Sequence, residues 1–224
     1  MMKVSRFDPV YEDGETKVEC PDELLSVPLM LVKSLSKGIT TNWKPDMPFD
    51  KRVFHVGMHP VEGVGKALYA SQFIPKGSYI LTFCGPLVNE EEATKRDLAN
   101  YGREMGNELQ IGDDFYVYLQ EPSRLINHSC EPNAGIIDDT VLIAAQDIQK
   151  DEEICFDYST TMDEPEVWQM ECMCGAANCR GYAADFRTLP IDTRKKYLQC
   201  GLVQNFIRKK YDKETGEPSN PTES

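Results

Sequence analysis

The sequence predicts an α+β domain that is rich in β-strands. From Val53 onwards, short apolar runs alternate with turn residues, which is typical of strands, whereas few segments have helical start and stop signals. With 224 residues, of which 41% are hydrophobic, the chain is long enough to bury one core. Its length suits one domain with extensions better than two domains.

The turn residues and the helix start and stop signals define the expected strands and helices. Strands are predicted at residues 79–84, 115–119, 141–145 and 153–156, with Asp138-Asp139 at a hairpin turn before the third. A helix is predicted from Asn89, a favoured N-cap followed by three acidic residues, to about Tyr101. A last helix is predicted at 190–200, with Gly201 just past its end.

The two ends of the chain differ from this pattern. Residues 1–54 form an N-terminal extension, in which Pro28 limits a possible helix within 24–35 to a start near Ser26. The extension either covers one edge of the following sheets or recognises a partner. Residues 212–224 contain almost nothing apolar and are predicted to be a disordered tail.

Charge and hydropathy exclude several classes of protein. The net charge of −13 argues against direct nucleic-acid binding, which needs clustered cations, and favours a basic partner. The longest apolar run, 27–32, is far below the roughly 20 residues that span a membrane. The first residues do not form a signal peptide, so we expect an intracellular protein in which disulfides are disfavoured. The oligomeric state is left open.

Three of the eight cysteines have the spacing of metal ligands. Cys172, Cys174 and Cys179 form a Cys-x-Cys-x4-Cys triplet, and glycines at 175 and 181 permit tight turns around it. A closed structural zinc site needs four ligands, so a fourth must come from elsewhere in the fold. The alternative is a chance cluster of buried thiols, because cysteine also packs as a small hydrophobic residue. The compact spacing favours zinc.

Three further segments carry a family resemblance. They are 65–70 (GKALYA), 124–133 (RLINHSCEPN) and 151–158 (DEEICFDY). In this order, and followed by the cysteine triplet, they resemble the SET-domain protein-lysine methyltransferases with a cysteine-rich post-SET segment. The resemblance extends over residues 61–208, about two thirds of the chain.

The resemblance implies a fold and a division of the chain. The implied SET fold consists of several small curved sheets around a knot-like crossing, in which residues 127–133 thread near the last strand. The SET domain would occupy 55–160, and an acidic loop with the zinc-bound post-SET segment would occupy 161–186. Residues 187–211 would form a C-terminal helical segment.

The resemblance also implies ligands for zinc and for S-adenosylmethionine. Cys130 would be the fourth zinc ligand, beside Cys172, Cys174 and Cys179. The residues implied to bind the cofactor are Gly65, Lys66, Ala67, Leu68, Asn127, His128 and Tyr182. Tyr182 could instead line the lysine channel, and Trp168 could pack on the same loop.

The family has a second glycine where this chain has Ala67, and a left-handed conformation there would be strained. His128 is implied to bind the cofactor, not to act as an acid or base, while His55 and His59 are interpreted as ordinary structural residues.

Tyr158 is implied to be the catalytic residue. Methyl transfer to lysine requires a neutral amine, and neutralising free lysine at pH 7 costs about 4–5 kcal/mol unless the site lowers its pKa. An aromatic channel beside a cationic cofactor would do so. Phe156 would stand at the position that controls product multiplicity and would favour di- or trimethylation. By sequence alone, it is equally well an ordinary core residue.

By the same resemblance, Phe83 would occupy a channel position where active relatives commonly have tyrosine. Tyr116 and Tyr118 are candidates to complete the aromatic wall. The resemblance implies histone tails as substrate and, in a eukaryote, a nuclear location. The alternative is a SET-fold binding module with little or no activity, which Phe83 and Ala67 favour. A purely structural zinc module would leave Asn127, Phe156 and Tyr158 unexplained.

Overall fold

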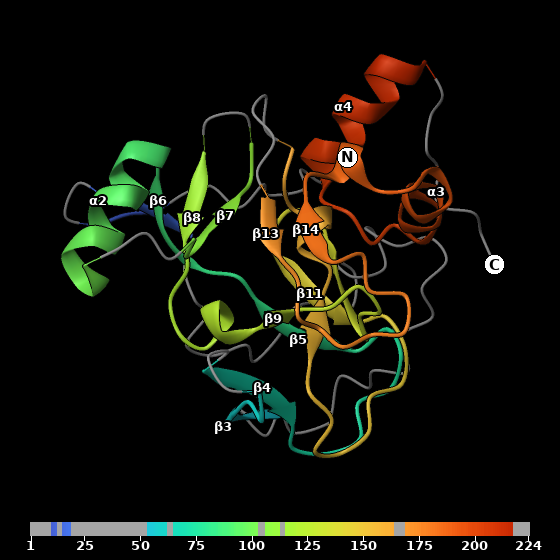
Figure 1. Ribbon diagram of the computed structural model, residues 1–224. Coiled ribbons are helices and arrows are strands. Elements are labelled where there is room, and N and C mark those ends of the chain that lie inside the picture. Colours follow the sequence, from blue (N-terminus) through green and yellow to red (C-terminus); the bar gives the residue numbers. More distant parts are fainter. Residues whose placement is uncertain are drawn as a thin grey trace, which may run out of the picture.

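A computed structural model describes residues 10–12, 15–18, 53–61, 65–102, 106–112, 115–163 and 169–216 (Figure 1). The helix expected within 24–35, Trp168 and the last residues of the tail lie outside these ranges. The strands are β1 (Val10–Glu12), β2 (Glu15–Val18), β3 (Phe54–Met58), β4 (Lys66–Ala70), β5 (Tyr79–Thr82), β6 (Gly85–Val88), β7 (Glu108–Gln110), β8 (Tyr116–Tyr118), β9 (Asn127–His128), β10 (Ala134–Ile137), β11 (Val141–Ala144), β12 (Cys155–Phe156), β13 (Gln169–Glu171) and β14 (Tyr182–Ala184). The helices are α2 (Glu90–Tyr101), α3 (Ile191–Cys200) and α4 (Asn205–Thr215), with short 3-10 turns η1 (Ser123–Leu125), η2 (Tyr158–Thr160) and η3 (Phe186–Thr188).

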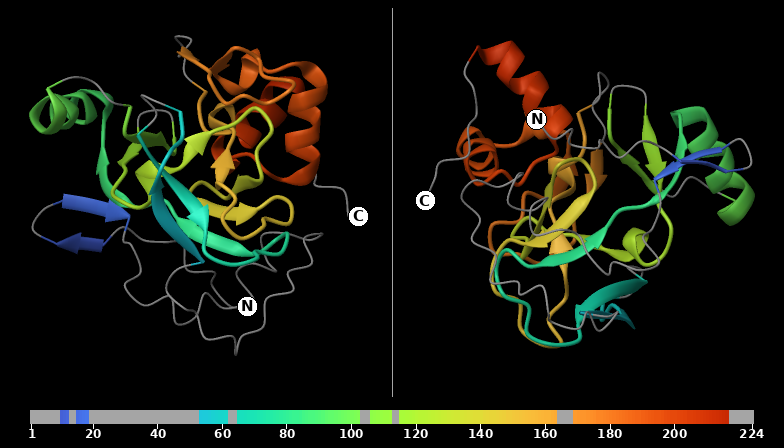
Figure 2. Two further views of the ribbon diagram at one scale, coloured as in Figure 1. Left: turned by 60° about the horizontal axis from the view of Figure 1, so that its bottom comes forward. Right: turned by 180° about the vertical axis from the view of Figure 1, so that it is seen from behind.

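The strands form small separate sheets, which confirms the β-rich α+β prediction. One sheet has the order β1-β2-β6-β8-β7 and another the order β10-β11-β5, and three strand pairs complete the set: β3-β4, β9-β12 and β13-β14. Helix α2 lies on the opposite side of the molecule from α3 and α4 (Figures 1 and 2). No helix among the described residues is long and apolar enough to span a membrane.

The hydrophobic core has a main cluster and a smaller C-terminal one. The main cluster joins β4, β5, β10 and β11 to the segment that carries Phe156. The smaller cluster packs η3 against α3 and α4, with Tyr197 and Ile207 among its buried members. The residues after β14 therefore form a C-terminal unit that has its own apolar contacts.

Two segments that are distant in the sequence pair in parallel beside the main cluster. β9 and β12 are the parallel pair among the described strands, with Asn127 opposite Cys155 and His128 opposite Phe156. The Asn133 amide nitrogen donates to the Glu153 carbonyl at 2.7 Å, and its amide oxygen accepts the Cys155 N–H at 3.0 Å. Residues 127–133 are thus held directly against the last strand of the domain.

Both predicted helices are confirmed. Asn89 caps α2 by accepting the Glu92 N–H at 2.9 Å, and Gly102 ends the helix in a left-handed conformation. Gly201 ends α3 in the same way.

The prediction of a tail from residue 212 is wrong for 212–215, because α4 continues to Thr215. The start of α4 is held by the Asp138-Asp139 hairpin: Asp138 O accepts the Asn205 N–H at 2.7 Å, and Asp139 Oδ1 accepts the Phe206 N–H at 3.0 Å. Tertiary contacts therefore stabilise a polar helix that composition alone does not predict.

Three further details correct or refine the expectations. β2 pairs with β6, so part of the N-terminal extension covers a sheet edge, one of its two expected roles. Residues 169–171, expected to lie in the acidic loop, form β13 and pair with β14. Cys84 is disulfide-bonded, contrary to the expectation that disulfides are disfavoured.

Candidate functional site

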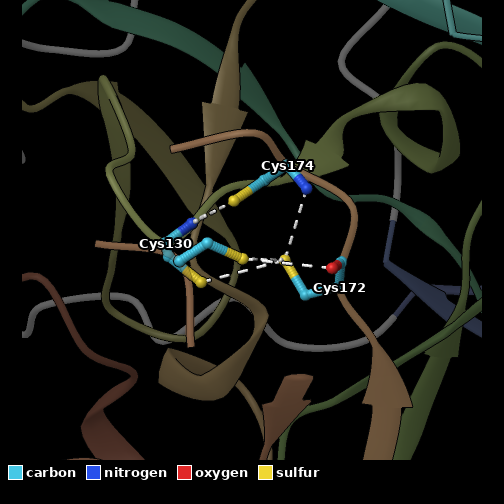
Figure 3. A group of neighbouring side chains, drawn as sticks. Cys130, Cys172 and Cys174 are labelled. Carbon is cyan, nitrogen blue, oxygen red and sulfur yellow. Dashed lines mark hydrogen bonds between the residues drawn. The ribbon is translucent and has the colours of Figure 1, made fainter. Parts of the chain in front are cut away.

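The four predicted zinc ligands meet in one place. The Sγ atoms of Cys130, Cys172, Cys174 and Cys179 all lie within 4.8 Å of one another, and Figure 3 shows three of these residues around one centre. Two sulfur–sulfur distances are 3.8 Å (Cys130–Cys172) and 3.6 Å (Cys172–Cys179). Four sulfurs at about 2.3 Å from a tetrahedrally bound zinc lie about 3.8 Å apart. The donor set and its spacing therefore fit zinc.

Backbone N–H groups are directed at all four sulfurs. Cys130 Sγ accepts from Arg180, Cys172 Sγ from Cys174, Cys174 Sγ from Cys130, and Cys179 Sγ from Gly181, at 3.4–3.5 Å. Burial raises the pKa values of Cys130 and Cys172. At Cys174 burial acts in the same direction, but it is outweighed by hydrogen bonds, chiefly from the backbone, so the pKa falls to about 7. These donors stabilise thiolate charge, which metal binding requires.

Three aromatic rings from two segments that are distant in the sequence pack successively against one another. The Phe83 ring is 5.4 Å from the Phe156 ring, which is 4.9 Å from the Tyr158 ring. Phe83 and Phe156 are buried and Tyr158 is partly buried. The row forms because Phe83 follows β5, whereas the other two residues lie in and just after β12. It therefore provides an apolar wall that ends in one hydroxyl.

The Tyr158 hydroxyl is neutral and is oriented by a hydrogen bond to the backbone. It donates to the Ile126 carbonyl at 2.7 Å, which leaves its oxygen lone pairs available to another donor. Burial, reinforced by the nearby Cys155 and Glu153, raises the pKa of Tyr158 well above its ordinary value of 10. This tyrosine can therefore orient an amine at neutral pH but cannot act as a phenolate base.

The residues predicted to bind the cofactor are partly brought together. The Asn127 amide donates to Glu153 Oε1 at 2.8 Å, and His59 Nε2 lies 3.1 Å from the other oxygen of that carboxylate. Because His59 follows β3, Glu153 connects Asn127 to the β3–β4 hairpin that carries Gly65 (φ +89°). His59, interpreted from the sequence as an ordinary structural residue, thus has a specific ionisable partner.

The other predicted cofactor residues lie in different surroundings. Ala67 is a regular residue of β4 opposite Gly57 and does not adopt a positive φ, so the expected strain is absent. The Ala67 and Leu68 side chains are fully buried, whereas Lys66 is exposed with Nζ 3.8 Å from Glu121. Tyr182 lies on β14, opposite Glu171, and is 39% exposed.

Tyr116 and Tyr118 do not complete the aromatic wall. Both are buried with Val88 and Ala93 in the cluster beneath α2, and the Tyr118 hydroxyl donates to Asp97 at 2.8 Å. Strand alternation correctly predicts that they share a face, but that face packs against α2.

Asp157 is a buried residue that the sequence argument missed. Its Oδ1 accepts from the Arg180 guanidinium at 2.8 Å and from the Ser159 N–H at 3.1 Å, while its Oδ2 accepts from the Tyr197 hydroxyl at 2.9 Å. Arg180 directly follows Cys179, a member of the cysteine cluster, and Tyr197 lies on α3. Asp157, which directly precedes Tyr158, therefore binds Arg180 and a residue of α3 through one carboxylate. Its position between Phe156 and Tyr158, both predicted site residues, is the sequence feature that could have indicated a role for Asp157.

Comparison with known proteins agrees with this geometry. Residues 65–159 match the family model of the SET domain. The chain is 32% identical over 150 residues to the H3 lysine-9 specific histone-lysine N-methyltransferase of Schizosaccharomyces pombe, covering 53% of this chain and 30% of the relative. It is 28% identical over 224 residues to the H3 lysine-9 specific histone-lysine N-methyltransferase dim-5 of Neurospora crassa, covering 78% of this chain and 59% of the relative.

A solved structure is also similar. The methyltransferase domain of human histone-lysine N-methyltransferase SETMAR is 26% identical, with a TM-score of 0.44 and coverage of 58% of each chain. The chain spans less than two thirds of the length of each of these proteins.

Proposed function

We propose that this protein is an S-adenosylmethionine-dependent protein-lysine N-methyltransferase that acts on histone tails. One observation carries the proposal: the Tyr158 ring packs against Phe156, which packs against Phe83, one strand away from Asn127 and within the residues that match the SET-domain family model. The relatives named above are histone-lysine N-methyltransferases, which supports the same reaction class.

The aromatic row and the tyrosine perform different parts of the proposed reaction. The apolar wall excludes water and favours the neutral form of the incoming lysine amine. The Tyr158 oxygen, whose own proton is directed at Ile126, accepts an N–H from that amine and aligns its lone pair. When bound, S-adenosylmethionine supplies a methyl group on a positively charged sulfur. No carboxylate base is needed once the amine has lost its proton to solvent.

The cofactor and the metal have separate roles in this proposal. Gly65 and the backbone of Asn127 and His128 would hold the cofactor, with Lys66, Ala67, Leu68 and Tyr182 as the other candidate contacts. Zinc would be held by Cys130, Cys172, Cys174 and Cys179 and would fix the post-SET segment beside the site.

Substrate and product follow from charge and shape. A chain of net charge −13 attracts a lysine-rich tail, and histones place the protein in the nucleus of a eukaryotic cell. Phe156 has no hydroxyl with which to hold a water near the amine, so the site leaves room for di- and trimethylation.

The test is methyl transfer from labelled S-adenosylmethionine to core histones, comparing the parent with Tyr158→Phe. Loss of the hydroxyl should lower kcat by about 10²–10³-fold with nearly unchanged cofactor affinity by calorimetry. Tyr101→Phe, which removes an exposed hydroxyl on α2, is the matched control and should retain full activity. A parent that binds cofactor but transfers no methyl group would favour a binding module instead.

A further inference from the structure

We propose that His128 is a positioning residue whose imidazole links the zinc cluster to the backbone of Tyr158. This inference deepens the proposed function and rests on it. The sequence placed His128 among the cofactor residues on family resemblance, whereas the side-chain contacts here lead to the metal cluster on one side and to the catalytic tyrosine on the other.

Each ring nitrogen of His128 has one partner. Nδ1 lies 3.2 Å from the Tyr158 backbone nitrogen, and Nε2 lies 3.4 Å from Cys130 Sγ. A backbone N–H can only donate, so Nδ1 must accept and must carry no proton. The proton of the neutral ring is therefore on Nε2, where it donates to the Cys130 sulfur.

The surroundings maintain this arrangement. Asp157 Oδ1 also lies 3.5 Å from Nδ1, but it already accepts from Arg180 and Ser159, and the unprotonated Nδ1 cannot donate to it. The His128 ring is buried and packs on the Tyr158 ring at 5.3 Å between centroids. Donation to a metal-bound thiolate is a typical outer-shell interaction, which orients the ligand and tunes metal affinity.

Arg180 forms a second connection between Cys130 and the residues around Tyr158. The Arg180 N–H donates to Cys130 Sγ, while its guanidinium donates to Asp157, the residue before Tyr158. Movement of Cys130 therefore acts on residues 157–158 through both His128 and Arg180. His128 is the shorter route, since it contacts the Tyr158 backbone itself.

Two amide variants separate the two halves of the contact. In His128→Asn the amide oxygen can take the place of Nδ1 and accept the Tyr158 N–H, but the side chain is too short to reach Cys130. In His128→Gln the amide nitrogen can take the place of Nε2 and donate to the sulfur, while the Tyr158 N–H loses its acceptor. Three quantities are measured for each variant: zinc affinity by chelator competition, hydrogen exchange of the Tyr158 amide, and kcat with cofactor Kd.

The two variants should fail in opposite ways. His128→Asn should bind zinc about 10–100-fold more weakly, with a protected Tyr158 amide and a kcat near the parent value at saturating zinc. His128→Gln should keep zinc affinity, exchange the Tyr158 amide faster and lose about tenfold in kcat with unchanged cofactor Kd. His55→Gln, on exposed β3, is the matched control and should change none of these.

Two results would overturn the proposal. Equal losses of zinc affinity and amide protection in both variants would make His128 a general packing residue. A raised cofactor Kd with unaltered amide exchange would return its side chain to the cofactor site. If the parent methylates no histone, the proposed function fails, but zinc affinity and amide exchange still decide the role of His128.

Discussion

Replacing Asp157 by asparagine should lower the free energy of unfolding by about 3 kcal/mol. The Asp157 side chain is fully buried, and the Arg180 side chain that pairs with it is only 14% exposed. Removing one partner of a buried ion pair costs about 3–5 kcal/mol, because the other charge stays buried without compensation. The lower end applies here, since Arg180 keeps some solvent contact and lies 3.3 Å from Ser159 Oγ.

The substitution changes charge with little change in shape. The asparagine oxygen can still accept from Arg180 and Ser159, and its amide can donate to the Tyr197 hydroxyl, which is able to accept. The loss therefore measures mainly the ion pair. Urea unfolding of the zinc-saturated protein would report it directly. At about 2–4 °C per kcal/mol, the melting temperature should fall by about 6–12 °C.

A double-mutant cycle isolates the pair. Arg180→Met removes the cation and keeps an apolar stem, so Asp157→Asn combined with Arg180→Met should be more stable than the sum of the two single losses predicts. Glu91→Gln, which breaks the exposed Glu91–Lys95 pair on α2, is the control and should leave unfolding unchanged. Additive losses, or a change below about 1 kcal/mol for Asp157→Asn, would refute the reasoning.

Three other predictions follow from the same contacts. Cys174→Ser should release zinc and increase proteolysis of the post-SET segment; unchanged metal content would mean that the ligand set is wrong. Phe156→Tyr should shift the products of methylation towards monomethyl-lysine by mass spectrometry, and an unaltered distribution would remove Phe156 from the control of multiplicity. Burial raises the pKa of Tyr79 to about 12, and it raises the pKa values of Tyr158 and Tyr197 as well. The unfolded chain loses these tyrosine protons first, near pH 10, so the contribution of these tyrosines to the free energy of unfolding should be constant below pH 10 and fall above it by about 1.4 kcal/mol per pH unit per tyrosine. Urea titrations between pH 9 and 11 would check this, and a flat profile would contradict it.

Elements with local causes could be predicted from the sequence. Helix α2 begins where Asn89 caps its first turn and ends at Gly102, and both signals lie within the segment itself. The last turns of α4 could not be predicted in this way. The start of that helix depends on the Asp138-Asp139 hairpin. The Phe206 N–H donates to Asp139, which lies 67 residues earlier in the chain, and no local pattern encodes this contact.

The residues of the site also differ in whether local sequence or distant contacts determine them. The triplet of cysteines is visible from spacing, but Cys130, 42 residues before Cys172, could be assigned only by resemblance. The contacts of Asp157 and His128 could not be predicted at all, because they exist only after β9 and β12 have paired in parallel. This pairing places His128 opposite Phe156 and so directs one ring nitrogen at Tyr158 and the other at Cys130.

The parallel pairing of β9 and β12 therefore positions the site as well as supporting the fold. Asn127 and His128 on one strand, and Phe156 followed by Asp157 and Tyr158 on the other, share one register. A slip of that register by one residue would remove the Tyr158 N–H from His128 and the Arg180 guanidinium from Asp157 together. Cys130, two residues after His128, lies in the cysteine cluster with Cys172, Cys174 and Cys179, and a metal bound there would resist such a slip. Removal of the metal is thus expected to loosen Tyr158 as well, whereas each His128 variant breaks only one of the two contacts. Tyr158 amide exchange, measured with and without zinc, is therefore the most direct test of the site.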